Sequence, residues 1–118
     1  LRVSQEEVIE NFKKFNCLDW DVIFLKGWFK DTLPIAPIEK LSVLRLDGDM
    51  YESTINSLDN LYHKLSIGGY CIIDDYHHTG CRNAVNDFRR DHNITEPLIR
   101  DEIFPPWDEL YYWRKENV

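Results

Sequence analysis

Apolar and polar positions between Ser42 and Tyr76 follow a strand, helix, strand pattern. The runs Ser42–Leu46 and Gly69–Ile73 are short and largely apolar, which is typical of strands. Gly68-Gly69 is expected to end the helix between them and to turn the chain. Two strands joined by a crossover helix are parallel. The helix is predicted because apolar residues recur at i, i+3, i+4 and i+7, at Tyr51, Thr54, Ile55, Leu58, Leu61, Tyr62 and Leu65.

Three elements are predicted before this unit. Ser4 and Glu7 have the spacing of a capping box, so an amphipathic helix is expected to begin at Ser4. Val22–Leu25 is short, apolar and partly β-branched, which predicts a strand. Lys26–Pro34 is expected to form a loop with one turn of helix, because its prolines exclude a longer one.

Further elements are predicted after the unit. A helix is expected from Cys81 to about His92, with Thr79 as its N-cap. Pro97–Arg100 and Leu110–Arg114 are expected to be strands. The alternation of strands and helices predicts an α/β fold with a mainly parallel sheet and flanking helices, in a single domain over residues 1–118.

Each of the two central strands ends in acidic residues, Asp47 and Asp49 after the first and Asp74 and Asp75 after the second. The carboxyl ends of parallel strands meet at one edge of a sheet, where α/β folds bind ligands. Four carboxylates at one edge repel one another unless a positive charge lies between them, and a divalent ion such as Mg²⁺ supplies it. The alternative is that these residues simply end strands and cap helices, which explains one aspartate better than two pairs.

Other chemistry could use the same residues. A metal-dependent sugar-nucleotide enzyme or a dehalogenase-type phosphatase would use the Asp47 and Asp49 pair, although Met50 follows where the phosphatases soon place a threonine. His77 and His78 adjoin the second acidic pair. They fit ligands of zinc or another transition metal, general bases, or a polar surface loop.

The segment Lys26-Gly27-Trp28 follows an apolar run. Its glycine allows close backbone approach, and its tryptophan could cover a flat ligand ring, although aromatic packing in a core is the commoner role. No glycine-rich dinucleotide loop and no Walker loop occur in the sequence.

Composition narrows the class of protein. The chain has 118 residues, of which 43% are hydrophobic, so one packed core is expected. A net charge of −7 without a basic stripe argues against a nucleic-acid partner, and no apolar run is long enough for a membrane span. The charged beginning does not look like a signal peptide, and Cys17, Cys71 and Cys81 have no paired spacing. We therefore expect a cytoplasmic protein with reduced thiols.

Five stretches occur in the order found in one known family: Phe24–Pro34, Leu44–Thr54, Leu65–Tyr76, Gly80–Val85 and Tyr112–Arg114. Together they cover nearly the whole chain and closely resemble the macrocin O-methyltransferase family. The resemblance implies the class I methyltransferase fold, S-adenosylmethionine and a divalent metal as cofactors, and a sugar hydroxyl as substrate.

The resemblance also implies roles for single residues. Asp47, Asp74 and Asp75 match the metal ligands of the family. Asp49, or Asp47 itself, would take the proton of the substrate hydroxyl. Lys26-Gly27-Trp28 would lie near the adenine end of the cofactor.

The family's glycine-rich cofactor loop and its first two strands should precede Leu1, and they are missing. We therefore expect a fragment or incomplete gene product that binds S-adenosylmethionine weakly by itself. In the family's strand order, 3-2-1-4-5-7-6, the strand Ser42–Leu46 would keep an open edge. Either Val22–Leu25 moves beside it, or a second copy pairs there in a homodimer.

Three functions follow in order of preference. The first is an O-methyltransferase-like protein acting on a sugar or other small-molecule hydroxyl. The second is a non-catalytic remnant of such an enzyme that keeps the metal site. The third is the metal-dependent sugar-nucleotide or phosphate enzyme.

Overall fold

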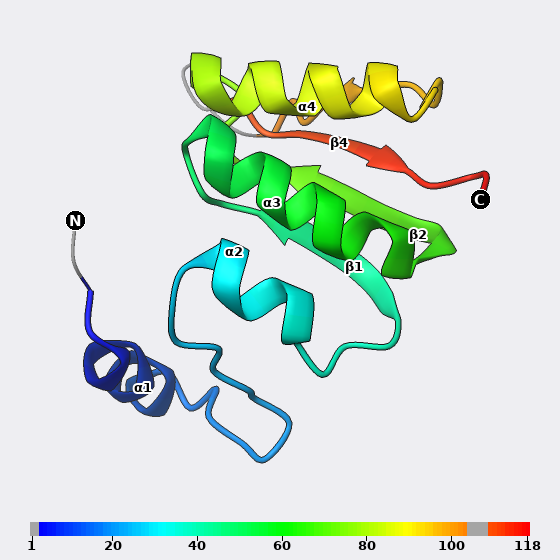
Figure 1. Cartoon of the computed structure of the whole chain (residues 1–118). Coiled ribbons are helices and arrows are strands. Elements are labelled where there is room, and N and C mark those ends of the chain that lie inside the picture. Colours follow the sequence, from blue (N-terminus) through cyan, green and yellow to red (C-terminus); the bar gives the residue numbers. More distant parts are fainter. Residues whose placement is uncertain (1–2, 104–108) are drawn as a thin grey trace.

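A computed structural model describes residues 3–103 and 109–118. Figure 1 shows the elements, which are, in chain order, α1 (Gln5–Lys14), α2 (Phe29–Thr32), η1 (Leu33–Ile35), β1 (Leu41–Leu46), α3 (Tyr51–Leu61), η2 (Tyr62–Lys64), β2 (Leu65–Ile73), α4 (Thr79–Asp91), β3 (Ile99–Arg100) and β4 (Tyr111–Arg114). None of the helices in the described ranges is long and apolar enough to cross a bilayer.

The four strands form one sheet in the order β1-β2-β4-β3. β1 and β2 are parallel and are joined through α3, so the predicted strand-helix-strand unit is confirmed. The sheet is nevertheless mixed, because β4 is antiparallel to both β2 and β3. Even so, β1, β2 and β3 all run in the same direction, in agreement with the expected mainly parallel sheet, and β4 alone runs the opposite way between β2 and β3. The α/β class and the flanking helices hold.

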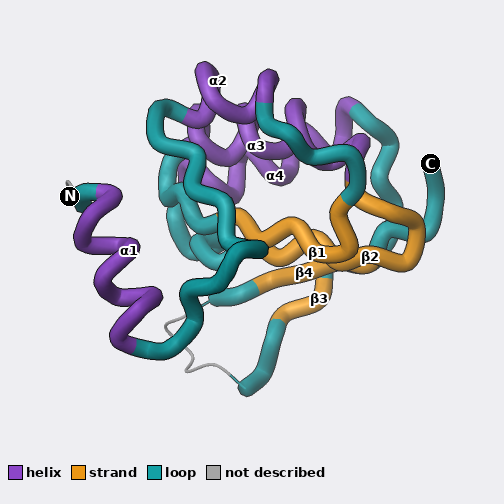
Figure 2. The backbone as a smooth tube through the Cα atoms, turned by 90° about the horizontal axis from the view of Figure 1, so that it is seen from below, coloured by secondary structure: helices purple, strands orange, loops and turns teal. Residues whose placement is uncertain are grey.

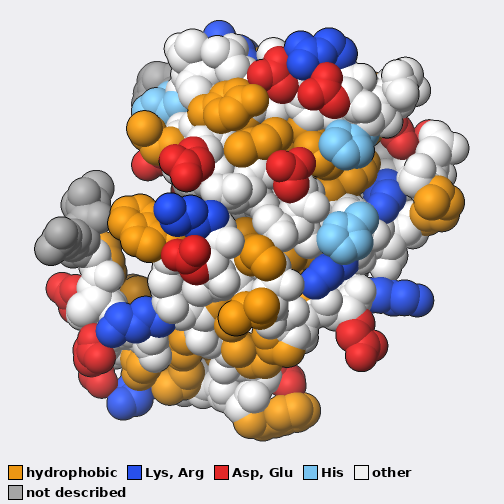
Figure 3. Space-filling view, viewed as in Figure 1, with side chains coloured by type: hydrophobic (Ala, Val, Ile, Leu, Met, Phe, Trp, Pro, Cys, Tyr) orange, Lys and Arg blue, Asp and Glu red, His pale blue; other side chains and the backbone are white. Residues whose placement is uncertain are grey.

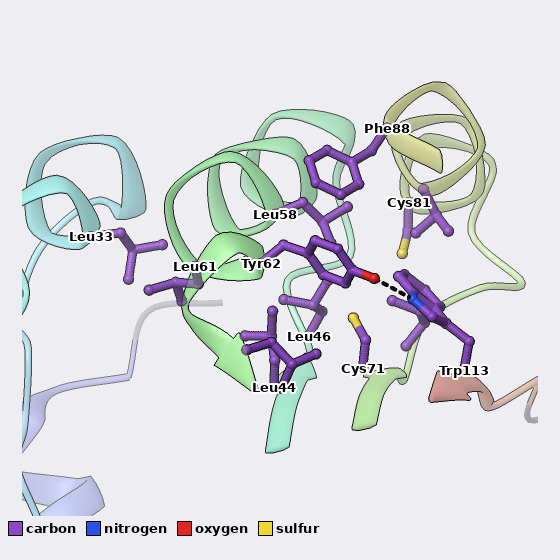
Figure 4. Close-up of a cluster of buried hydrophobic side chains, with 13 residues drawn as sticks. Leu33, Leu44, Leu46, Leu58, Leu61, Tyr62, Cys71, Cys81, Phe88 and Trp113 are labelled. Atoms are coloured by element: carbon purple, nitrogen blue, oxygen red, sulfur yellow. Dashed lines mark hydrogen bonds between the residues drawn. The ribbon is translucent and has the colours of Figure 1, made fainter. Parts of the chain in front are cut away.

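The helices α2, α3 and α4 cover one face of the sheet (Figure 2). Side chains alternate towards the carboxyl ends of β1 and β2, where Leu44, Leu46, Cys71 and Ile73 are buried beneath these helices. The core formed in this way is shown in Figure 4, and its largest fully buried side chain is Trp113. Its indole Nε1 donates a hydrogen bond to the hydroxyl of Tyr62 at 3.0 Å, so the polar atom of the largest core side chain is satisfied.

The other face of the sheet is bare within the described residues. Val43 on β1 and Tyr70 on β2 point there and are 51% and 42% exposed. Tyr70 packs against Tyr112 of β4, with ring centroids 6.2 Å apart. Sheets with parallel strands are normally covered on both faces, so this aromatic and aliphatic face is unusual for a surface.

The beginning of the chain contributes little to the core. The capping box of α1 is confirmed, because the hydroxyl of Ser4 accepts from the backbone N–H of Glu7 and the carboxylate of Glu7 accepts from that of Ser4. However, α1 has no buried residue. Figure 3 shows apolar side chains at the surface over this part of the molecule, and Trp20 and Trp28 are 90% and 76% exposed.

Several element predictions need correction. Val22–Leu25 forms neither a helix nor a strand and pairs with none of the described strands, so the predicted strand and its internal pairing with β1 are not found. Gly68 and Gly69 lie inside β2 instead of ending the helix. A Cβ on Gly69 would lie 2.7 Å from the carbonyl oxygen of Ser42, so this glycine permits the close approach of β1 and β2. The N-cap of α4 is His78, not Thr79.

Candidate active site at the carboxyl edge of the sheet

Three of the four predicted carboxylates gather where β1 and β2 end. Asp47, Asp49 and Asp75 each offer an oxygen, and these oxygens all lie within 4.8 Å of one another. Asp47 and Asp49 follow β1, and Asp75 follows β2, as the parallel pairing of the two strands requires. Oxygen ligands at this spacing suit a hard divalent cation.

The fourth carboxylate, Asp74, has a partner that the sequence analysis overlooked. Nη2 of Arg45 donates to Oδ1 of Asp74 at 2.7 Å and lies 3.1 Å from Oδ2 of Asp47. The hydrogen bond with Asp74, together with the charges of the nearby aspartates, raises the pKa of Arg45. Arg45 lies on β1, two positions before Asp47, which directly follows the strand, and residues two positions apart in an extended chain share a face. This spacing is the sequence pattern from which the proximity of Arg45 to the aspartates could have been predicted.

Asp75 is the buried member of the cluster, with 7% of its surface exposed. Burial raises the pKa of its carboxyl group, and the nearby charges of Asp49 and Asp47 raise it further. The backbone N–H of Asp49 opposes this shift by donating to Oδ2 of Asp75 at 3.2 Å. The charge of Asp75 is therefore only partly compensated by the protein, which is the condition that a bound cation would relieve.

Asp49 lies in the left-handed backbone region, with φ of 59°. Aspartate tolerates this conformation better than most residues. The hydroxyl of Ser53 fixes the loop by donating to the carbonyls of Gly48 and Met50. The Asp49 side chain is 66% exposed, so it can meet a substrate that approaches from solvent.

Both helices that follow the acidic residues begin at this edge. A Cβ on Gly80 would lie only 2.9 Å from the backbone nitrogen of Tyr51, so the amino-terminal turns of α3 and α4 are in close contact. The amino end of a helix carries partial positive charge. The two helix ends therefore favour the negative charges gathered beside them.

The predicted cofactor segment, Lys26-Gly27-Trp28, directly precedes a residue that contacts this edge, Phe29. Gly27 has φ of 143°, a conformation that favours glycine. Trp28 is the N-cap of α2, and the ring of Phe29, the first residue of α2, lies within 3.3 Å of where a Cβ on Gly48 would be. Lys26 and Gly27 also line a shallow pocket together with residues of α1. Contact of this segment with a cofactor stays a prediction.

His77 and His78 lie in the turn between β2 and α4. Nε2 of His78 is 3.9 Å from Oδ1 of Asp49. The two imidazole rings are close together, with centroids 4.1 Å apart. The structure thus places both histidines beside the carboxylates, which the sequence analysis had left open.

Known proteins resemble this chain in both sequence and structure. The sequence profile of the macrocin-O-methyltransferase (TylF) family matches residues 1–115. Demethyldecarbamoylnovobiocin O-methyltransferase of Streptomyces niveus is 53% identical over 108 residues, which are 88% of this chain and 41% of that protein. Mycinamicin III 3''-O-methyltransferase of Micromonospora griseorubida is 46% identical over 115 residues, which are 98% of this chain and 43% of that protein.

Among solved structures, the O-methyltransferase NovP superposes with a TM-score of 0.88 at 47% identity, over 98% of this chain and 46% of NovP. The calicheamicin-biosynthesis enzyme CalS11, a TDP-rhamnose 3'-O-methyltransferase, gives a TM-score of 0.59 at 20% identity, over 75% of this chain and 40% of CalS11, and shows the fold alone. The chain spans about 40% of the length of its curated relatives. Its fold matches part of a methyltransferase, and the chain belongs to the macrocin O-methyltransferase family.

Proposed function

We propose that this chain forms the metal- and acceptor-binding part of an O-methyltransferase that uses S-adenosylmethionine and a divalent cation. The acceptor would be a hydroxyl of a sugar or another small molecule. The observation that carries the proposal is the cluster of Asp47, Asp49 and Asp75 at the carboxyl edge of the sheet, in a chain whose relatives are O-methyltransferases.

The cation would be held by Asp47 and Asp75. Asp74 would be a further ligand, with its carboxylate shared between the cation and Arg45. The donor set fits Mg²⁺, because all of these ligands are carboxylate oxygens and the buried Asp75 lacks full compensation of its charge. When bound, the ion would lower the pKa of a hydroxyl that contacts it.

Asp49 would then accept the proton of the acceptor hydroxyl. Its exposed carboxylate can both meet the substrate and release the proton to water. Asp47 is the alternative base, but Arg45 already pairs with it. When bound, S-adenosylmethionine supplies a methyl group on a positively charged sulfur, and Lys26-Gly27-Trp28 would line the path to it.

A chimaera tests this function. The matching segment of NovP would be replaced by this chain, which corresponds to it over 98% of its length. The chimaera should transfer labelled methyl groups from S-adenosylmethionine to the NovP acceptor, and the transfer should stop with a chelator. Asp49→Asn should lower the rate at least about a hundredfold, in line with loss of a general base, whereas Asp59→Asn on the exposed surface of α3 should not.

Three results would contradict the proposal. A chimaera that folds and binds S-adenosylmethionine but transfers no methyl group would favour the non-catalytic remnant. Unchanged activity of Asp49→Asn would exclude Asp49 as the base. Hydrolysis of a phosphate ester or a sugar nucleotide by the chain alone would instead favour the third function.

A further inference from the structure

A second group of metal-ligating side chains lies beside the carboxylate cluster. Asp75, His77 and His78 each offer one ligand atom, and these three atoms lie within 4.8 Å of one another. We propose that they form a separate site for a transition-metal ion such as Zn²⁺, sharing Asp75 with the carboxylate site. This site goes beyond the proposed methyltransferase function, which does not require it.

The backbone of the turn brings the two histidines together. The backbone N–H of His78 donates to the carbonyl of Asp75 at 2.9 Å. Nε of Arg82 donates to the carbonyl of Tyr76 at 3.0 Å, and Nη2 of Arg82 donates to that of His77 at 3.5 Å. These bonds involve only main-chain atoms of the turn and leave the ring nitrogens of both histidines out of them. The nearest charged group to the His78 ring is the carboxylate of Asp49, whose Oδ1 lies 3.9 Å from Nε2, beyond hydrogen-bond distance.

The donor set selects the class of metal. Two imidazoles and one carboxylate are ligands of Zn²⁺ and similar ions, whereas Mg²⁺ prefers oxygen ligands. Bonds of about 2.0–2.2 Å to Zn²⁺ bring tetrahedral ligand atoms to about 3.3–3.5 Å from one another. The rings must therefore close in by a small rotamer change, which the exposed side chains of His77 and His78 permit. Three protein ligands would leave one position of the ion open to water or to a substrate atom.

The sharing of Asp75 makes the two sites distinguishable by mutation. Asp75 has two carboxylate oxygens, and the backbone N–H of Asp49 donates to one of them, Oδ2. Loss of Asp75 should weaken both sites. Loss of Asp47 should weaken only the carboxylate site, and loss of the two histidines only the new one.

Co²⁺ is the probe for the test, because it replaces Zn²⁺ and its visible absorption reports nitrogen ligation. Wild-type chain should bind one Co²⁺ ion at this site, seen as a visible spectrum of nitrogen ligation that Zn²⁺ abolishes by displacement. The double variant His77→Gln, His78→Gln should bind Co²⁺ about a hundredfold more weakly or worse, because loss of ligands costs at least as much as loss of outer-shell partners. Circular dichroism would verify the fold of this variant, which we expect to be intact because both substituted residues are exposed.

Controls separate this site from other ligands. His63→Gln and Cys17→Ser remove exposed donors elsewhere and should leave Co²⁺ binding unchanged. Asp47→Asn should also keep it. The double histidine variant should still bind Mg²⁺ at the carboxylate site in a calorimetric titration, so this test can fail without the proposed function failing. Unchanged Co²⁺ affinity in the double variant, or loss of Co²⁺ binding in His63→Gln or Cys17→Ser, would overturn the proposal.

Discussion

Arg45 sets the charge balance of the acidic edge. Its guanidinium lies between Asp47 and Asp74, at 3.1 and 2.7 Å from their oxygens. The positive charge that the four aspartates require is thus supplied in part by the protein. A metal ion held by Asp47 and Asp75 would compensate the remaining negative charge, above all that of the buried Asp75.

Replacement of Arg45 should therefore destabilise the metal-free chain. Arg45→Met removes one positive charge and leaves the aspartates to repel one another. We expect a loss of about 1 kcal/mol in the free energy of unfolding, the upper range for exposed pairs. Urea denaturation with and without Mg²⁺ would measure it, and Mg²⁺ should recover most of the loss.

Arg90→Met is the matched control. Arg90 also bridges two carboxylates, those of Asp87 and Asp91, but on the outer surface of α4 and away from the edge. Its loss should change stability by less than about 0.5 kcal/mol, as for most surface changes. Equal losses in the free energy of unfolding of both variants would mean that repulsion between the aspartates does not destabilise the edge.

Asp75→Asn should stabilise the metal-free protein. The pKa of Asp75 is raised in the fold by burial and by its acidic neighbours. The folded state thus binds a proton more tightly than the unfolded state, so this group lowers stability as pH rises from the ordinary aspartate pKa through the raised value. The neutral amide removes that penalty and can still accept from the N–H of Asp49.

Thermal melting in a chelator measures this effect from acidic to neutral pH. At neutral pH the melting temperature of Asp75→Asn should exceed that of wild type by a few degrees, and the gap should close at acidic pH. Asp59→Asn, on the exposed surface of α3, should show no gap. A lower melting temperature of Asp75→Asn throughout would refute the charge penalty.

At the residue scale, much of the site could be predicted from the sequence. Strand ends and parallel pairing were enough to place Asp47, Asp49 and Asp75 together. The bond between Arg45 and Asp74 was not predicted. The prediction used only the acidic residues at the strand ends, whereas Arg45 lies two positions before Asp47. The left-handed conformation of Asp49 could not be predicted, because it depends on the hydroxyl of Ser53 and on Asp75.

Among the elements, α3 and α4 decide how the edge is built. Their amino-terminal turns meet at Gly80, where any side chain would collide with the backbone of Tyr51. Both helices follow directly from the loops that carry the aspartates and histidines. Separation of these turns should therefore disturb both the stability and the metal site.

Gly80→Ala tests this contact. The added methyl group would lie 2.9 Å from the backbone nitrogen of Tyr51, and a backbone atom cannot simply rotate away. We expect a loss of about 1–3 kcal/mol in the free energy of unfolding, typical of overpacking. Chemical denaturation would measure it, with Asn83→Ala on the exposed face of α4 as the control, which should not destabilise. A variant as stable as wild type would show that the two helices have room to move apart.

Helices and strands were predicted correctly where the sequence has a repeating pattern. The prediction failed where the structure of a segment depends on a partner strand. The periodicity of α3 and the capping box of α1 identified these helices. Val22–Leu25 has the composition of a strand but lacks a partner strand within the described residues, and hydrogen bonding to a neighbour is what makes a strand.

Seen as a whole, the molecule has one covered and one bare face. β1 is the end strand of the sheet, and its outer edge has no partner among the described strands. Val43 and Tyr70 lie on the bare face beside this edge. Open edges of this kind are templates for pairing with another chain, so we propose that a second copy of the chain pairs there in a homodimer.

Size-exclusion chromatography with light scattering tests the homodimer at micromolar concentration. Wild type should have twice the monomer mass, and Val43→Lys should be monomeric, because a charge would enter the paired face. Ile35→Lys is the control: Ile35 is 83% exposed and lies in η1, on the helix side of the sheet, so this variant should stay dimeric. A monomeric wild type would contradict the homodimer.

The central claim is that the carboxyl edge binds a divalent cation through Asp47 and Asp75, and calorimetric titration of the chain with Mg²⁺ tests it most directly. Mg²⁺ is the suitable probe because it prefers oxygen ligands and binds the nearby imidazole nitrogens poorly. We predict a single site whose affinity falls at least about tenfold in Asp47→Asn and in Asp75→Asn, the range for damage to a metal site, and stays unchanged in Asp59→Asn. Absence of Mg²⁺ binding at millimolar concentration, or equal affinity in wild type and Asp75→Asn, would contradict the account.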